Sequence, residues 1–302
     1  MTAITSTTIQ TSNDLSEADG FTRRYIQLKD IRLHCVEAGN GPLIVLLHGF
    51  PEFWFSWRHQ IPALAGAGFH VFAPDLRGYN LSDKPKGVKH YYVNRLTSDV
   101  AGLIRALGEE KAIVVGHDWG AGVAWAFAMT YPKMLDKLII LNGPHPAKMM
   151  EGLRRASQLR KSWYMFFFQL PFIPELWISA GNFKMIRDTF RRDLSREKMS
   201  DAEIDRYIEA IARKNAAGCA INYYRAAFRA GMLGKLRSWP KIESPAMVVW
   251  GERDRYLGID LADPGPELVS NLRLEKLPKA SHWVQVDEAD RVNELILDFI
   301  KN

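Results

Sequence analysis

The sequence predicts an α/β fold with a mostly parallel, doubly wound sheet, an antiparallel hairpin at its N-terminal side and an inserted helical region. Three observations support this prediction. Apolar runs such as "PLIVLLHG" recur along the chain, and each ends in a loop rich in glycine or proline. Segments with helical periodicity lie between these runs. After Pro146 the apolar runs stop, and they return only at "SPAMVVWG". Strands buried on both faces and joined by helices are typical of a parallel sheet.

The chain begins with a polar segment, residues 1–20, that contains no arginine and no basic start followed by an apolar run. This composition argues against a secretory signal or a mitochondrial presequence, so we predict a flexible leader. From Tyr25 to Val36, two short segments rich in apolar and β-branched residues are separated by "KD". That pattern predicts an antiparallel hairpin.

Strands and helices alternate through residues 21–146. Buried strands are predicted in "PLIVLLHGFPE", "FHVFAPD", "KAIVVGHD" and "LDKLIIL". Helical periodicity predicts helices at Trp54–Ala65, Val93–Ala106 and Ala121–Thr130. In open sheets of this kind the ligand site lies in the loops after the carboxyl ends of the strands.

The alternation of strands and helices stops from Ala147 to Leu236. There the pattern is helical, with many arginines and aromatic residues. Strand-and-loop patterns return in "SPAMVVWGERD" and "LRLEKLPKASHW", and Val286–Ile300 predicts an amphipathic closing helix. We therefore interpret residues 147–239 as a helical cap or lid. The core is then discontinuous and comprises residues 21–146 and 240–302.

The cap region carries the positive charge of the chain, whose formal net charge is +6. From Pro146 to Pro240 there are 18 Lys and Arg against 9 Asp and Glu. Because the two signs are interleaved, a solvated helical surface is favoured over an anionic partner, and no nucleic-acid signature is present.

The most apolar cap segment is "WYMFFFQLPFIPELW". Prolines and a glutamate interrupt it, which argues against a membrane span. A lid over an apolar pocket is favoured, and a patch that docks on lipid is the alternative.

Cysteines and cofactor motifs are sparse. Cys35 and Cys219 lie far apart without metal-ligand spacing, which favours two free thiols and a cytoplasmic location. No glycine-rich phosphate loop or metal-ligand cluster is recognised, so we predict neither a cofactor nor a metal. The expected partner is a small molecule, and the expected state is a monomer or a homodimer.

The segment "GHDWG" has the form of a nucleophile elbow, but Asp118 stands where a serine is usual. It follows a predicted buried strand and precedes a predicted helix, as that motif requires. Asp254 ends the strand in "VVWGERD", and His282 lies in "ASHW" before the last helix. Nucleophile, acid and histidine therefore follow the chain order of the α/β-hydrolase triad.

The segment "HGFPE" is expected to form an oxyanion loop. In such a loop the amide of Phe50 donates to the oxyanion together with the amide of Trp119, which follows the nucleophile. A cis peptide at Pro51 is expected to orient the Phe50 amide. For His48 and His117, structural hydrogen bonds are favoured over proton transfer.

Together, "HGFPEFWFSWR", "APDLRGYNLSDKP", "GHDWGA", "NYYRA", "WGERD" and "SHW" resemble the epoxide hydrolases of the α/β-hydrolase superfamily, from about Tyr25 to Ile300. This resemblance implies the α/β-hydrolase fold and cofactor-independent conversion of a small apolar epoxide to a vicinal diol, with a role in detoxification. It also implies that Asp118 forms an alkyl ester, which water activated by His282 and Asp254 hydrolyses.

The resemblance further assigns two cap tyrosines as acids for the epoxide oxygen. Tyr224 in "NYYRA" matches one and Tyr164 in "SWYMFFFQLP" the other, with Tyr223 as the neighbouring candidate. Four more residues are assigned to the substrate pocket: His48, Pro51, Trp163 and Phe167.

Three alternatives stay open. Haloalkane dehalogenases also resemble this chain, but they carry a second side-chain donor for the halide where this chain has Phe50, which has none. In that alternative, Trp163 of the cap would supply the second donor. Fluoroacetate dehalogenases have an arginine where this chain has Trp119. A ligand-binding protein on the same scaffold would not need His282 or Asp254.

Overall fold

The computed structural model describes residues 9–10, 20–229 and 239–302. Nine strands of this described part form one sheet in the order β1-β2-β3-β5-β4-β6-β7-β8-β9. The strands are β1 (Ile9–Gln10), β2 (Thr22–Gln27), β3 (Arg32–Ala38), β4 (Leu43–Leu47), β5 (His70–Pro74), β6 (Ala112–His117), β7 (Leu135–Leu141), β8 (Ala246–Gly251) and β9 (Leu272–Leu277).

The strands from β5 to β9 pair in parallel, whereas β2 and β3 form the predicted antiparallel hairpin and β3 is antiparallel to β5. Every residue of β4, β6 and β8 is buried. Their continuous apolar runs reflect this burial, because helices cover both faces of the parallel part of the sheet. The predicted α/β fold with its mostly parallel sheet is therefore confirmed.

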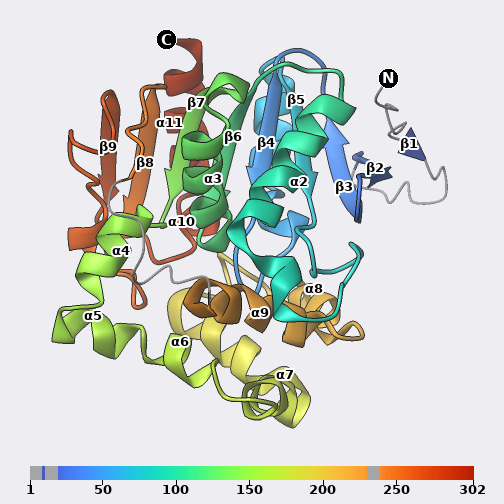
Figure 1. Cartoon of the computed structure of the whole chain (residues 1–302), viewed down its shortest axis with the longest axis vertical. Coiled ribbons are helices and arrows are strands. Elements are labelled where there is room, and N and C mark those ends of the chain that lie inside the picture. The colour runs from blue at the N-terminus through green and yellow to red at the C-terminus, as the bar shows by residue number, and fades with distance from the viewer. Residues whose placement is uncertain (1–8, 11–19, 230–238) are drawn as a thin grey trace.

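Helices cover the two faces of the sheet in a doubly wound arrangement (Figure 1). One face carries the contacting helices α2 and α3, and the other carries α1 and α11, which also contact each other. The core helices are α1 (Gln60–Gly66), α2 (Val93–Ala106), α3 (Trp119–Thr130), α10 (Val284–Asp287) and α11 (Ala289–Lys301).

The described residues between β7 and β8 form helices and no strand, and we call these the cap helices. They lie across the carboxyl ends of the parallel strands (Figure 1). They are α4 (Pro146–Gly152), α5 (Ala156–Lys161), α6 (Trp163–Phe167), α7 (Ile173–Asp193), α8 (Asp201–Ala212) and α9 (Ala216–Arg229). Non-helical backbone at 180–183 interrupts α7. The division into core and cap domains stays a prediction. Residues 230–238, near the predicted end of the cap, lie outside the described residues.

The predicted helix Trp54–Ala65 is instead a 3-10 turn, Trp54–Trp57, followed by α1 from Gln60. Pro62 explains the break, because a proline has no N–H and is tolerated only in the first turn of a helix.

Most of the predicted flexible leader lies outside the described residues. Its Ile9–Gln10 pair forms β1 and runs antiparallel to β2, with Ile9 opposite Ile26. The edge of β2 explains this unpredicted strand, because an edge presents unpaired N–H and C=O groups.

Candidate active site

Asp118 occupies a strained turn between β6 and α3. Its backbone has φ 50° and ψ −117°, a conformation that favours glycine. The turn fits only because the neighbouring positions are glycines. A Cβ on Gly120 would lie 2.0 Å from the Leu47 carbonyl oxygen, and one on Gly49 would lie 2.4 Å from the Asp118 Cβ. The glycines of "GHDWG" and "HGFPE" thus bring the oxyanion loop against the aspartate.

The oxyanion loop contacts the Asp118 carboxylate directly. The Phe50 amide donates to Asp118 Oδ1 at 2.8 Å. The Phe50–Pro51 peptide bond is cis, as predicted. Trp119 is the first residue of α3, so its backbone N–H belongs to the first turn of that helix, where amides have no partner within the helix. Of the two predicted oxyanion donors, the Phe50 amide contacts the carboxylate, and the Trp119 amide follows Asp118 directly in the chain.

His282 lies between the two predicted carboxylates. Its Nδ1 is 2.7 Å from Asp254 Oδ2, and its Nε2 is 3.6 Å from Asp118 Oδ2. Asp254 is fixed by further hydrogen bonds, from Asn142 Nδ2 at 2.7 Å and from the Leu257 amide at 2.9 Å. The Asp254 contact leaves Nε2 of His282 directed at Asp118, which is the orientation that a general base acting there requires.

The three groups stabilise one another in their charged forms. Burial opposes the charge of His282, but the carboxylates of Asp254 and Asp118 raise the pKa of the imidazole well above its usual range. Burial likewise opposes ionisation of Asp118, yet His282 and the Phe50 amide lower the pKa of that carboxyl. Asp118 is therefore a carboxylate at neutral pH, and His282 carries a proton while that carboxylate is free.

A buried polar network that the sequence did not predict connects the loops of the site. Glu52 Oε2 accepts from the Gly49 amide at 2.8 Å and lies 2.7 Å from His117 Nδ1. Nε2 of His117 lies 2.9 Å from the His282 carbonyl oxygen, and Gln285 Nε2 donates to Glu52 Oε1 at 3.0 Å. Glu52 therefore joins the oxyanion loop, the aspartate loop and the histidine loop.

Tyr224 and Tyr164 project from the cap helices α9 and α6 toward Asp118. All three residues line the same two cavities. The two phenol rings lie 5.9 Å apart, and the Tyr224 ring packs edge-on against Trp119 at 4.9 Å. Burial, together with the nearby Asp118 charge, raises the pKa of both phenols well above the usual range. Both hydroxyls thus keep the proton that a donor needs.

Tyr223, the neighbouring candidate, lines the smaller cavity but not the larger one. Its hydroxyl donates to the Arg77 carbonyl oxygen at 2.8 Å. Because that hydrogen bond uses its single O–H, Tyr223 has no proton free for a substrate. The structure therefore favours Tyr224 of the two.

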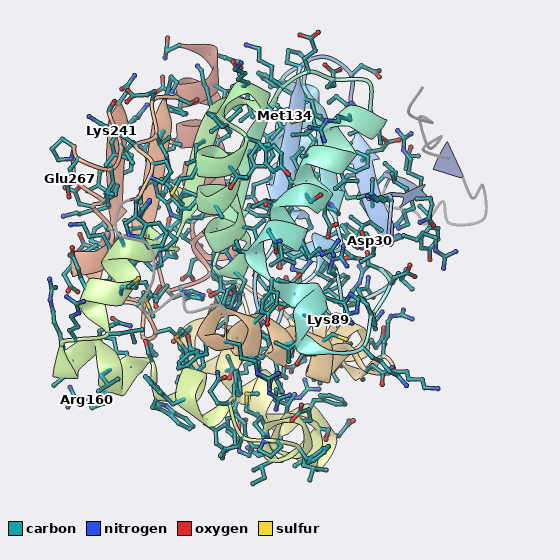
Figure 2. The ribbon with its side chains drawn as sticks, viewed as in Figure 1. Asp30, Lys89, Met134, Arg160, Lys241 and Glu267 are labelled. Atoms are coloured by element: carbon teal, nitrogen blue, oxygen red, sulfur yellow. The ribbon has the colours of Figure 1, made fainter. Side chains whose placement is uncertain are left out.

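The larger cavity, of about 660 Å³, lies on one side of Asp118 and is bounded by the cap. Pro51, Trp163 and His282 line it, as do Phe168 and Trp177. Arg160 of α5 also lines it, and Figure 2 shows this residue at the outer edge of the cap. The cavity thus extends from the aspartate toward the outside of the cap.

A second cavity, of about 240 Å³, shares Asp118, Tyr164 and Tyr224 with the first. Its remaining walls are largely apolar and include Met149, Met165 and Trp239. The aspartate and the two tyrosines therefore lie where two compartments meet. No sequence pattern predicted this second compartment.

Two of the predicted pocket residues line neither of the two cavities. His48 is fully buried beneath the loop, where its Nε2 accepts from the Leu76 amide at 2.9 Å, and it lines neither cavity. Phe167 also lines neither cavity, because its ring packs against Trp163 and Trp177. Within the described part of the chain, no group of three His, Cys, Asp or Glu side chains is arranged to hold a metal ion.

Comparison with known proteins places the chain in a family. Residues 42–289 match the family described as the alpha/beta hydrolase fold. The chain is 41% identical over 290 residues to Epoxide hydrolase 1 of Caenorhabditis elegans, covering 93% of this chain and 71% of that protein. It is 41% identical over 287 residues to AB hydrolase superfamily protein YfhM of Bacillus subtilis (strain 168), covering 94% and 99%.

A solved structure is similar as well. The crystal structure of an epoxide hydrolase from Bacillus megaterium in complex with an inhibitor has a TM-score of 0.84 and 32% identity, covering 92% of this chain and all of that one. The chain therefore belongs to the α/β-hydrolase fold family. The predicted fold class and the resemblance to epoxide hydrolases are both confirmed.

Proposed function

We propose that this protein is an epoxide hydrolase that converts an epoxide and water to a vicinal diol through an alkyl ester on Asp118. One observation carries the proposal. A carboxylate on a nucleophile elbow faces two protonated tyrosines, Tyr164 and Tyr224, across the junction of two cavities. The relatives named epoxide hydrolase support the same activity.

The hydrogen bond at the carboxylate selects the attacking atom. Oδ1 of Asp118 accepts from the Phe50 amide at 2.8 Å, whereas Oδ2 has a longer contact of 3.6 Å with His282 Nε2, so we assign the attack to Oδ2. Oδ2 forms a bond to one epoxide carbon, the carbon–oxygen bond of the ring breaks, and its electron pair goes to the ring oxygen. Tyr164 and Tyr224 donate hydrogen bonds to that oxygen, and one of the two phenols transfers its proton to it and becomes a tyrosinate. An alkoxide requires this assistance because it is a poor leaving group.

Ester formation also prepares the second step. Asp118 loses its negative charge when it is alkylated, so the pKa of His282 falls. The imidazolium proton then passes through water to the tyrosinate, which restores the phenol and leaves the imidazole available as a base. His282 then accepts a proton from a water molecule that attacks the ester carbonyl carbon. Oδ1 becomes the oxyanion, already hydrogen-bonded to the Phe50 amide, and each such donor contributes roughly 3–4 kcal/mol elsewhere. The bond between the carbonyl carbon and Oδ2 then breaks, and Oδ2 leaves with the diol and takes the proton from His282.

The proposal extends to the setting of the enzyme. Cys35 and Cys219 are both buried, free thiols. Free cysteines of this kind are usual in a reducing compartment, which supports the inferred cytoplasmic location. The largely apolar wall of the smaller cavity supports an apolar substituent on the substrate.

Product analysis with two substrates tests the reaction class. We expect the purified chain to convert styrene oxide to its diol and to release no bromide from 1-bromobutane. Trp163, the second halide donor in the dehalogenase alternative, has 54% of its side chain exposed, a poor setting for a halide site. Bromide without diol would contradict the proposal, and so would the absence of both products across a panel of small epoxides.

Replacement of Tyr224 by phenylalanine tests the acid. We expect Tyr224→Phe to lower kcat for styrene oxide by roughly 10²–10³-fold, because one donor to the developing alkoxide is lost. Tyr223→Phe is the matched control on the same helix. Since that hydroxyl bonds to a backbone carbonyl, its removal is expected to reduce kcat far less. Equal losses in the two variants would remove Tyr224 from its proposed role.

A further inference from the structure

Exposed apolar side chains gather on one part of the cap. Among the described residues, ten large apolar side chains are exposed, and eight of them lie between Leu159 and Trp177. We call these eight the 159–177 patch. Phe172 is 79% exposed, Leu176 68% and Ile173 53%. Exposed apolar residues that occur singly need no explanation, whereas a cluster of this size marks a binding surface.

Aromatic contacts join two helices of the patch. The Trp163 ring packs against Phe167 and against Trp177, so α6 and the start of α7 share one aromatic surface. Figure 1 shows α5, α6 and α7 at the end of the molecule opposite the C-terminus. Phe172 is held outward with φ 62°, which is unfavourable for an aromatic residue. Such strain at an exposed aromatic points to a functional surface.

The charge around the patch is mostly positive. Residues 154–184 contain five cations and a single acid, Glu175, which Arg225 neutralises. Two of the cations are paired with acids outside this range, Arg155 with Asp260 and Lys184 with Asp188. Within the described residues, no ion pair involves Arg154 or Arg160. Aromatic and aliphatic side chains beside free cations are the composition of segments that lie in the interface of an anionic bilayer.

The larger cavity opens beside this surface. Trp163 and Trp177 belong both to the 159–177 patch and to the cavity wall, and Lys184 lines the cavity nearby. A surface in contact with lipid would therefore place the cavity next to the apolar phase. No helix among the described residues is long and apolar enough to cross a membrane.

We propose that the 159–177 patch docks this protein on the surface of a membrane that contains anionic lipid. A second copy of the chain is the other candidate occupant. It is disfavoured because a symmetric contact would set two surfaces with the same excess of cations against each other. The docking does not depend on the reaction proposed above, since it concerns the outer side of the cap.

Cosedimentation of the full chain with vesicles tests the docking. We expect binding to vesicles of phosphatidylcholine and phosphatidylglycerol in equal parts. Binding to phosphatidylcholine alone should be weaker, and added salt should weaken binding to the mixed vesicles. Failure of the wild-type chain to bind the mixed vesicles at low salt would overturn the proposal.

A double substitution tests the apolar part. Phe172→Ser with Leu176→Ser is expected to lower the partition coefficient by about a hundredfold, given the transfer free energy of two large apolar side chains. Both side chains are exposed, so the fold is expected to persist, which thermal unfolding would verify. Val93→Ser is the matched control, because Val93 is 44% exposed at the start of α2. Equal binding of the double variant and the wild type would overturn the proposal.

A second pair of substitutions tests the charge. Arg154→Gln with Arg160→Gln is expected to weaken binding to the mixed vesicles by about fivefold for each charge removed. Lys133→Gln with Lys301→Gln removes the same charge from the opposite end of the molecule and is expected to leave binding unchanged. Equal effects of the two pairs would show a nonspecific charge effect and contradict the docking. A dimer in sedimentation velocity that the Phe172 and Leu176 changes dissociate, without vesicle binding, would identify a second copy as the occupant.

Discussion

Replacement of His282 by glutamine is expected to trap the alkyl-enzyme. A glutamine side chain can donate to Asp254 as the imidazole does, but it cannot accept a proton from water. Attack by Asp118 needs no base, so the ester still forms. Its hydrolysis is expected to slow by roughly 10²–10⁴-fold, the range for loss of a general base. Intact-protein mass spectrometry would then show a mass increase equal to that of the epoxide.

The surface histidine His59 offers the control, since it is exposed before α1 and lines neither cavity. His59→Gln should turn over normally and show no adduct. Proteolysis of the trapped enzyme should locate the adduct on the peptide that contains Asp118. A His282→Gln enzyme that keeps wild-type turnover, or that is slow without any adduct, would contradict the ester mechanism.

The parallel strands and the convergence of Asp118, Asp254 and His282 were predictable because both depend on local patterns. The strand β6 is apolar at nearly every position since both its faces are covered, and the glycines after it report a close backbone approach. The carboxyl ends of parallel strands meet at one edge of a sheet. Asp118, Asp254 and His282 were therefore expected together before any distance was known, and the structure brings them together.

Side-chain direction limited the prediction of the pocket wall. Tyr164 of the short helix α6 and Phe168 directly after it are four residues apart, and both line the larger cavity. Trp163 and Phe167 are also four residues apart, but only Trp163 lines that cavity, because the Phe167 ring packs against Trp163 and Trp177. The sequence shows that this segment is apolar on most sides. Only the packing of α6 on the core determines which face meets the cavity.

Contacts between distant loops were beyond local patterns altogether. Glu52, His117 and Gln285 come from three segments, and no spacing rule connects them. Asn142 had a weak signal, since it is a polar residue directly after the buried strand β7. That signal did not reveal that its amide would hold Asp254. Buried polar networks of this kind become visible only when each donor and acceptor is placed.

Replacement of Asp118 by glycine is expected to separate activity from stability. Loss of the nucleophile should lower kcat by about 10⁵–10⁶-fold, as it does in other covalent hydrolases. The turn at φ 50° and ψ −117° is unfavourable for any residue with a Cβ, whereas glycine adopts it freely. We therefore expect the free energy of unfolding of Asp118→Gly to exceed that of Asp118→Ala by about 1 kcal/mol. Urea unfolding followed by tryptophan fluorescence measures this difference.

Both variants lose the same carboxylate and the same contact with His282, so the comparison isolates the backbone strain. An alanine variant as stable as the glycine variant would show that the turn is not strained, and measurable diol formation by either would show that another group acts as nucleophile.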